Sequence, residues 1–524
     1  MTEATLFDDG RVFTGLRYAD SFVVEDGRVV AVGTAEEARR ATPAGADRRP
    51  LHGRLVLPGL IDAHVHLPDL TEAREGLDLG RVASLPDLVD ALRAWARDHP
   101  DGPLVGRGWD PERSSDRRWP SRHDLDGVVA DRPLIVLQAS GHAGIGNSAA
   151  LDGAGVVRGT ADPAGGRFGR ESDGTPDGRA FERALATLVE PLDALTSVDP
   201  RALARTLRAC AALGLTTLGA MCVRPDEAAA YREMDRGPAL PVRVRAYLHY
   251  RFWREGYRPP ADPTSGTGRF AIVGVKAFTD GALGPRTAWL SAPYSDDPGN
   301  SGMAVASAGE LAEVAASVSA DGLNPAFHAI GDRAVATALE ALDRPRRELP
   351  TPPRIEHASL TPPEVWPALE RVRPVLVVQP GFVWSDHWLA SRLGADRARW
   401  AYAFRTLGGR GLVLAGSSDA PYDPVDPWRG IRAAVHRVDP ARRSANPSPN
   451  EALSYERAVQ LYTANGGVAV GVPGLGTLEV GAPGDVLVTA ATSIEEAVES
   501  GAATVRETWV AGRPVASGAD GQTV

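Results

Sequence analysis

The chain has 524 residues, a formal net charge of -10, 43% hydrophobic residues and 24% charged residues. This length suits two to four domains or an α/β barrel with additions, and the composition excludes a largely disordered chain. No apolar run is long enough for a transmembrane helix, the acidic first ten residues lack the apolar core of a signal peptide, and the acidic balance argues against nucleic acid or an anionic membrane as a partner.

The two ends of the chain have similar patterns. Residues 1–57 contain short β-type segments separated by turn signals such as Asp26-Gly27, and the same pattern returns from about residue 474. Neither piece is long enough to form a stable sheet alone. We therefore predict a small β-sandwich domain built from residues 1–57 and 471–524.

Residues 58–470 alternate short apolar strands with helices. Helix signals include Asp199-Pro200 at a start and Gly214 after an end. Strand–helix alternation repeated eight times predicts an α/β fold of the (β/α)8 TIM-barrel type. The expected strands cover residues 59–67, 215–221, 242–250, 271–278, 323–330, 353–360, 375–382 and 411–421.

The segment 67–198 is far longer than an ordinary connection between a barrel strand and the next helix. It contains a helix pattern that begins at Ser84, with Asp87 placed for a capping box, and an apolar strand pattern at 134–140. The Gly-rich stretch 159–169 lacks the lysine of a phosphate-binding loop, so we expect a flexible loop there. We predict an inserted subdomain that covers the mouth of the barrel.

Polar residues at the ends of barrel strands mark the expected active site, because the carboxyl ends of these strands form the catalytic face. His64 and His66 are two residues apart on one strand, so both side chains point to the same face, where they can chelate a metal. Such a pair is a weak signal alone. Four further polar residues at strand ends strengthen it: Lys276, His328, His357 and Asp419.

Lys276 is the single lysine among 57 basic residues. Arginine replaces lysine where only positive charge is needed, but not where a nucleophilic amine is needed. The position of Lys276 at a strand end therefore suggests a chemical role. The alternatives are a neutral, desolvated lysine and a salt bridge with Asp280.

Several motifs resemble known families. The segments LPGLIDAHVH, HAIGD, RIEHASL and GSSDAP resemble the metal-binding motifs of the amidohydrolase superfamily. GVKAFTDGALGPRTA and SGHAGIGNSAAL resemble its branch called amidohydrolase family 3, which includes N-substituted formamide deformylase. The resemblance covers essentially the whole chain.

The resemblance implies two divalent ions per chain, Zn²⁺ by expectation, with Mn²⁺ or Fe²⁺ as alternatives. His64, His66 and Asp419 would hold one ion, and His328 and His357 the second. Lys276 would bridge them as a carbamate formed with carbon dioxide. Physical reasoning supports this bridge, because two dications about 3.5–4 Å apart need an anionic bridge besides hydroxide. A carbamylated amine supplies that charge.

The implied reaction is the hydrolysis of a non-peptide amide-type C–N bond, in an N-acyl or N-formyl amine or a cyclic amide, by a metal-bound hydroxide. Asp419 would carry the proton to the leaving nitrogen. His142, in the insertion, would donate a hydrogen bond to the developing oxyanion, or else be a structural loop histidine. Arg286 would contact a substrate carboxylate or pair with a neighbouring acid.

Two other functions stay open. One is a mononuclear zinc aminohydrolase that deaminates a small heterocycle, with Lys276 structural; the other is a scaffold protein that has lost its site, although the ligand set shows no gap. The expected partner is a small-molecule substrate, with a homodimer left open. Only two cysteines, Cys210 and Cys222, are present, which fits the cytoplasm.

Overall fold

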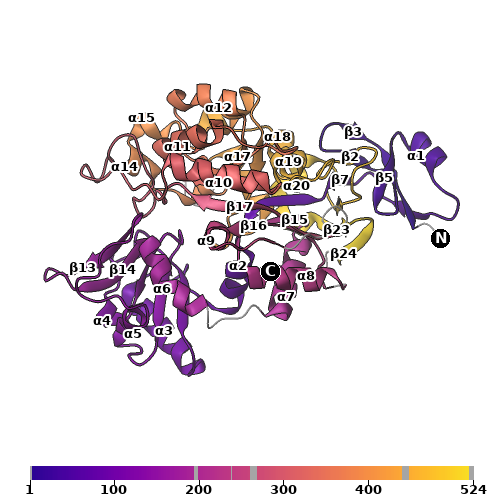
Figure 1. The fold of residues 1–524 in the computed structure, drawn as a ribbon. Helices are drawn as coiled ribbons and strands as arrows, with labels where there is room; N and C mark the ends of the chain where they lie inside the picture. Colours follow the sequence, from indigo (N-terminus) through magenta and orange to yellow (C-terminus); the bar gives the residue numbers. More distant parts are fainter. Residues whose placement is uncertain (1–2, 194–198, 238, 260–267, 440–447, 518–524) are drawn as a thin grey trace.

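The computed structural model describes residues 3–193, 199–237, 239–259, 268–439 and 448–517 (Figure 1). It contains a parallel barrel, an insertion with its own sheet, and two sheets formed by the chain ends. None of the helices in the described ranges is long and apolar enough to cross a membrane.

The eight strands predicted for a barrel form one parallel sheet, in which strands that follow one another in this set lie side by side. Their residues are almost all buried, as expected for strands covered on both faces. The N–H of Asp419 donates to His64 O (2.9 Å) and that of His66 to Ala420 O (2.9 Å), which nearly closes the barrel. The strands are β8 (Leu60–Val65), β15 (Leu215–Val223), β16 (Arg243–His249), β17 (Phe270–Phe278), β18 (Asn324–Ala329), β19 (Arg354–His357), β20 (Val375–Val378) and β21 (Leu414–Gly416).

Helices follow most of these strands and pack against the barrel. The first, α7, begins at Pro200 after Asp199, whose side chain accepts from the N–H of Arg201, and Gly214 follows its end with φ +92°. These local signals place the start and the end where the sequence predicted them. The helices are α7 (Pro200–Ala212), α8 (Pro225–Asp235), α9 (Tyr250–Arg254), α10 (Ala308–Ala320), α11 (Asp332–Asp343), α12 (Trp366–Val372), α13 (Phe382–Ser385), α14 (Leu389–Leu393), α15 (Ala395–Ala398), α16 (Phe404–Gly409), α17 (Pro427–His436), α18 (Tyr455–Leu461) and α19 (Ala464–Ala469), with short 3-10 turns at Pro363–Val365 and Pro449–Glu451.

Strands from both chain ends share one sheet, because β7 (Leu55–Pro58) pairs antiparallel with β22 (Val486–Thr489). Figure 1 shows the yellow C-terminal strands beside the indigo N-terminal ones. This sheet also holds β2 (Arg11–Phe13), β3 (Tyr18–Ala19), β23 (Val505–Val510) and β24 (Arg513–Ser517), and the second sheet holds β1 (Ala4–Asp8), β4 (Ser21–Glu25), β5 (Arg28–Gly33) and β6 (Asp47–Pro50). Helices α1 (Ala35–Ala41) and α20 (Ile494–Ser500) and a 3-10 turn at Gly501–Thr504 flank these strands.

The two terminal sheets share a hydrophobic core. The rings of Phe7 and Phe22 stack at 4.6 Å, and Phe7 meets Trp509 edge-on at 5.2 Å. Each of these aromatic side chains is at least 97% buried, so the N-terminal and C-terminal pieces depend on one another for burial of apolar surface. Strand β8 follows β7 after one residue, which ties this core to the barrel.

The insertion after β8 has its own six-stranded sheet, in the order β13-β14-β12-β11-β10-β9. Ser84 caps α3 by accepting from the N–H of Asp87, which is one half of the predicted capping box; the Asp87 carboxylate bonds the Ser84 hydroxyl (2.5 Å) and not its backbone N–H. The interpretation of residues 159–169 as a loop was wrong in part, because Gly166–Arg170 forms β13 and pairs with β14. The elements are α2 (Leu67–Glu75), β9 (Leu77–Asp78), α3 (Leu85–Asp98), β10 (Leu104–Trp109), α4 (Arg122–Asp126), β11 (Leu134–Gln138), β12 (Ala143–Gly146), α5 (Ser148–Gly153), β13, β14 (Pro176–Glu182) and α6 (Arg183–Asp193).

Candidate metal centre and pocket

Six side chains from the carboxyl ends of barrel strands come together in the interior. They come from β8, β17, β18 and β19 and from the segments that follow β8 and β21. All are at least 91% buried, which is unusual for so many polar groups and calls for partners. They are His64, His66, Lys276, His328, His357 and Asp419.

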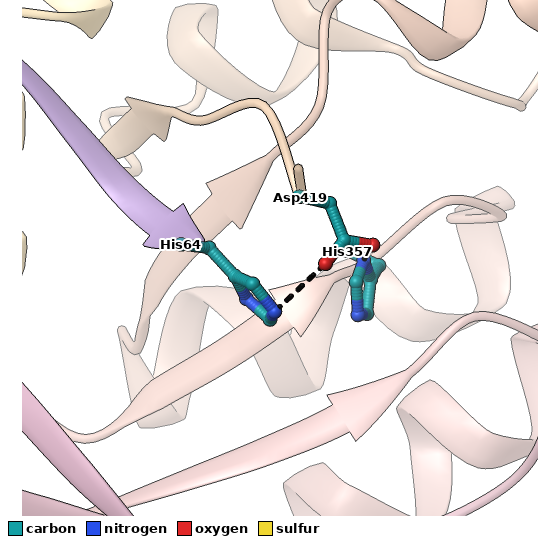
Figure 2. A group of neighbouring side chains, drawn as sticks. All are labelled: His64, His357 and Asp419. Atoms are coloured by element: carbon teal, nitrogen blue, oxygen red, sulfur yellow. Dashed lines mark ion pairs between the residues drawn. The ribbon is translucent and has the colours of Figure 1, made fainter. Parts of the chain in front are cut away.

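His64, His357 and Asp419 form the tightest part of this group (Figure 2). Each offers a ligand atom, and these atoms all lie within 4.8 Å of one another. Asp419 Oδ1 is 3.1 Å from His64 Nε2 and 3.3 Å from His66 Nε2. Asp419 therefore lies against both histidines of the pair on and after β8.

His328 extends the group on the other side. Its ring centroid is 4.5 Å from that of His357, whose ring is in turn 5.0 Å from that of His64. The structure thus brings all four predicted histidines into one continuous row of imidazoles. His328 lies at the edge of this row, outside the 4.8 Å cluster of ligand atoms.

The backbone turns left-handed where two of these residues lie. His357 has φ 70° and Asp419 has φ 60°, a region that costs about 1–2 kcal/mol for residues other than glycine. In a regular strand neighbouring side chains point to opposite faces. The turn at His357 breaks that alternation, so Glu356 and His357 both reach the interior, where Glu356 bonds His64 and His357 faces Asp419.

Hydrogen bonds fix which nitrogen of each imidazole carries a proton. His64 Nδ1 donates to Glu356 Oε2 (2.6 Å), His357 Nδ1 to Gln379 Oε1 (2.8 Å), and His328 Nε2 to Gly281 O (3.1 Å). The amide of Gln379 is oriented in turn by its bond to Ser417 Oγ (2.9 Å). Since burial lowers the pKa of His328 and His357, these two rings keep their other nitrogen as a lone pair, the form in which histidine binds metals.

The charges support the same conclusion. Burial lowers the pKa of His66, His328 and His357, so these imidazoles are neutral. Burial acts to raise the pKa of Asp419, but the neighbouring His64 and His66 hold it well below its usual value, so this carboxylate is ionised. Neutral imidazoles around one carboxylate match the ligand chemistry of zinc and similar divalent ions.

Two polar atoms of this group lack a hydrogen-bond partner among the described residues. His64 Nε2 and Asp419 Oδ1 are buried, and neither has a hydrogen-bond partner within the described ranges. The two atoms lie 3.1 Å apart, and a divalent ion bound between them would give each a partner. The residues present therefore fit a divalent metal ion.

Lys276 lies in β17, where it pairs with His249 of β16, and its side chain is 1% exposed. Its Nζ is 5.1 Å from the ring centroid of Phe278, and burial lowers its pKa. Among the residues that the structure describes, no carboxylate lies within ion-pair distance of this amine. Asp280, the alternative partner, instead accepts from the N–H groups of Trp289, Ile330 and Gly331.

His142 comes from the insertion and reaches the barrel mouth. Its ring centroid is 5.0 Å from that of His328, and its Nδ1 donates to Glu182 Oε2 (2.8 Å). Thr287 Oγ1 donates to Glu182 Oε1 (2.5 Å), so one carboxylate links the insertion to the loop after β17. Burial acts to lower the pKa of His142, but the charge and hydrogen bond of Glu182, together with the charges of Asp419 and Asp280, raise it overall, which favours the protonated ring.

A pocket opens onto this centre. His357 and Asp419 form part of its wall, and His142 and Gln138 contribute from the insertion. The insertion and the barrel therefore contribute residues to the same pocket. Arg286 pairs with Asp296 (2.9 Å). Of the two roles considered for Arg286, contact with a substrate carboxylate and pairing with a neighbouring acid, the structure shows the second.

Three positioning side chains were not identified from the sequence: Glu356, Gln379 and Glu182. Glu356 belongs to the RIEHASL motif, so its place beside a predicted ligand was a usable signal. Glu182 ends β14, whose residues alternate between buried and half-buried over 176–180 in the structure. Nothing local distinguishes Gln379, which directly follows β20.

Replacing Glu356 by Gln is expected to weaken both the fold and the metal site. Arg354, fully buried, donates to Glu356 through Nε and Nη2 (both 2.8 Å), and the variant leaves this guanidinium without its counter-charge. Breaking a buried pair costs about 3–5 kcal/mol, and loss of a ligand's orienting partner lowers metal affinity about 10–100-fold. Urea unfolding and metal titration measure the two effects.

The matched control is Glu36→Gln, which removes the carboxylate of an exposed pair with Arg40 (2.6 Å). Exposed pairs contribute little, so its stability should stay within about 0.5 kcal/mol of wild type with unchanged metal affinity. If Glu356→Gln behaved like this control, Glu356 would not be the group that holds His64.

Comparison with known proteins gives consistent matches. Residues 50–516 match the model of a family described as "Amidohydrolase family". The Bacillus subtilis (strain 168) protein named "Putative amidohydrolase YtcJ" is 32% identical over 87% of this chain and 88% of its own length. The N-substituted formamide deformylase of Arthrobacter pascens is 28% identical over 90% of each chain. The crystal structure of an uncharacterized metal-dependent hydrolase from Pyrococcus horikoshii OT3 superposes with a TM-score of 0.76 at 28% identity, over 93% of this chain and 97% of that one.

Proposed function

The chain belongs to the amidohydrolase family, whose members include metal-dependent hydrolases of C–N bonds, and we propose that it cleaves a non-peptide amide-type bond in a small substrate. An N-acyl amine, an N-formyl amine or a cyclic amide would fit. The observation that carries the proposal is the pair of buried atoms without a hydrogen-bond partner among the described residues, His64 Nε2 and Asp419 Oδ1, 3.1 Å apart beside a pocket that Asp419 lines.

The proposed centre holds two Zn²⁺ ions, with Mn²⁺ or Fe²⁺ as alternatives. His64, His66 and Asp419 would bind one ion, and His328 and His357 the second. When bound, such ions lower the pKa of a water to about 7 and polarise a carbonyl oxygen. The neutral imidazoles and the ionised Asp419 support this assignment, because both kinds of group are ligands that such ions prefer.

Lys276 is proposed to carry a carbamate that bridges the ions. Its amine is buried and free of ion pairs in the described part of the chain, and its lowered pKa favours the neutral, nucleophilic form. The nitrogen lone pair adds to the carbon of carbon dioxide, a C–O π pair moves onto oxygen, and the nitrogen loses a proton to solvent. The product is an anion with two oxygens, where the free amine would be neutral or positive.

Asp419 and His142 are the proposed catalytic residues. Asp419 Oδ1 has no hydrogen-bond donor among the described residues, so it can accept a proton from the attacking water and pass it to the leaving nitrogen. His142 lines the pocket, and its Nδ1 is held by Glu182. The protonated ring that Glu182 favours would donate from Nε2 to the oxygen of the substrate carbonyl.

A mononuclear zinc aminohydrolase acting on a small heterocycle is the second candidate. The observation that favours it is that His64, His357 and Asp419 form a compact three-ligand set, whereas His328 lies outside the 4.8 Å cluster. In that case Lys276 would be structural. One ion per chain would support this candidate, and two would support the first.

We also place the protein in the cytoplasm, with a small molecule as its partner. Cys210 and Cys222 are both free thiols in the structure, which suits a reducing compartment.

Metal removal tests the proposed function. Purified protein should contain about two divalent ions per chain, and a chelator should abolish hydrolysis of N-acyl and N-formyl amines, with zinc or manganese restoring it. Elemental analysis and an activity screen before and after dialysis give the measurement. Full hydrolysis by metal-free protein would contradict the proposal.

A further inference from the structure

The pocket lining contains a second polar wall, which we define as the hydrogen-bonded pair Asp386 and Tyr402. The same pocket is lined by His142, His357 and Asp419. Asp386 directly follows α13, in the region after β20, and Tyr402 precedes α16. Neither element carries a proposed metal ligand, so this wall has no part in binding the ions.

Asp386 has a neutral partner only. Its Oδ2 accepts a hydrogen bond from the Tyr402 hydroxyl. Within the described ranges, no arginine, lysine or histidine nitrogen lies within 4.0 Å of its carboxylate. Asp386 is a partly exposed residue of the pocket wall, so a ligand can reach it.

The other carboxylates of the lining are compensated. Asp110 pairs with Arg113 (3.3 Å), and Glu112 pairs with Arg392 (2.8 Å). Asp419 belongs to the metal centre. Among the described lining residues, Asp386 is therefore the carboxylate with neither an ion pair nor a place in the proposed metal centre; the charge of Arg113, which is paired with Asp110, acts on it only from beyond ion-pair distance.

The surroundings of Asp386 make an uncompensated negative charge costly. Burial and the charge of Asp423 raise the pKa of Asp386 to about 7, against the lowering effects of the Tyr402 hydroxyl and of the Arg113 charge. A cation at this wall would remove that cost. The adjoining lining is apolar and aromatic and includes Leu283, Ile330 and Phe382, which suits a hydrocarbon stem and the flank of a cation.

We propose that Asp386 forms a subsite for a positively charged group of the substrate, so that the pocket selects amides carrying a protonated amine on an apolar stem. That the substrate is an amide rests on the proposed function. The binding of the cation does not depend on it, because the subsite lies outside the metal centre.

Binding is therefore measured first, without turnover. Hexylammonium and hexan-1-ol share a stem and differ in the charged end. By calorimetry on the metal-loaded full chain, hexylammonium should bind at least about tenfold more tightly than hexan-1-ol, and Asp386→Asn should abolish the difference. The amide oxygen that this substitution introduces can still accept from Tyr402, and unchanged binding of hexan-1-ol shows that the pocket is intact.

Asp396→Asn is the matched control, because Asp396 is an exposed carboxylate on α15 and outside the pocket lining. It removes the same charge and should bind hexylammonium like wild type. Equal binding of the two probes by wild type would overturn the proposal. So would a hexylammonium preference that survives in Asp386→Asn.

Hydrolysis is measured second and separates the two proposals. N-(5-aminopentyl)acetamide is compared with N-hexylacetamide, and 6-amino-N-methylhexanamide with N-methylheptanamide, which puts the charge on the amine or the acyl side. A kcat/KM at least about tenfold higher for a charged member, lost in Asp386→Asn, supports the subsite. If no amide is hydrolysed while the binding preference holds, the proposed function fails and the subsite stands. If neutral and charged amides are hydrolysed alike, the subsite fails and the proposed function stands.

Discussion

Asp419→Asn is expected to lower kcat by at least about 10²-fold while the protein stays folded, because proton transfer by a positioned side chain contributes about 10²–10⁴-fold. Asn has nearly the same shape as Asp, and the backbone bond from residue 419 N–H to His64 O (2.9 Å) does not involve the side chain. What the variant loses is the negative charge beside His64 and His66, and the ability to accept and release a proton. Steady-state kinetics, metal content and circular dichroism are measured together.

Asp423→Asn is the matched control for this prediction. Asp423 is a buried carboxylate on the same segment, but it accepts from Ser385 Oγ (2.5 Å) and pairs with Arg429 (3.3 Å) instead of meeting the imidazoles. A much larger fall in kcat for Asp419→Asn than for this control would tie the loss to the metal centre. Near wild-type kcat in Asp419→Asn with its metal retained would show that another group moves the proton.

The barrel could be predicted because each strand is a short apolar run, and five of the eight have a chemistry-bearing residue near their end. Residues such as His328 and Asp419 stand out against an apolar background, and the carboxyl ends of parallel strands meet on one face. Pattern alone therefore indicates a shared location. The sequence pattern contains no information on distances. Which imidazoles contact one another is known only from the structure.

The groups that orient the ligands could not be found in the same way. Glu356 bonds a histidine 292 positions away, and period-two alternation assigns Glu356 and His357 to opposite faces. The left-handed backbone at His357 removes that alternation, and no glycine or asparagine marks it in the sequence. Tertiary packing fixes this conformation, so local propensity does not predict it.

The insertion shows a related limit. Its glycine-rich segment has the composition of a loop, yet Gly166–Arg170 pairs with β14, and the Cβ that a larger residue would place at Gly166 would lie 2.4 Å from Ala184 N. Glycine at this position permits close packing of the backbone and is not a sign of a flexible loop. The same hairpin brings Glu182 to His142, because Phe181 pairs with Ala143 across the ladder.

Lys276→Arg is expected to lose at least about 10²-fold in kcat/KM and to bind fewer than two ions per chain. The reason is charge: two dications and a hydroxide leave three positive units, and Asp419 removes only one. A carbamate on Lys276 removes another, whereas a guanidinium stays protonated and adds one beside the ions, which is costly in a buried site. Elemental analysis and kinetics on wild type and variant give the two measurements.

The carbamate itself has a direct signature. Lys276 is the single lysine of the chain, so protein labelled with ¹³C-bicarbonate should show one side-chain carbamate signal, which Lys276→Arg removes. The double variant Lys276→Arg/Arg40→Lys restores the lysine count at an exposed position, where the amine stays protonated near its usual pKa of about 10.4 and should give no stable signal. A Lys276→Arg protein that binds two ions and turns over like wild type would contradict the bridge, and Lys276 would then be a structural residue of a different metal centre.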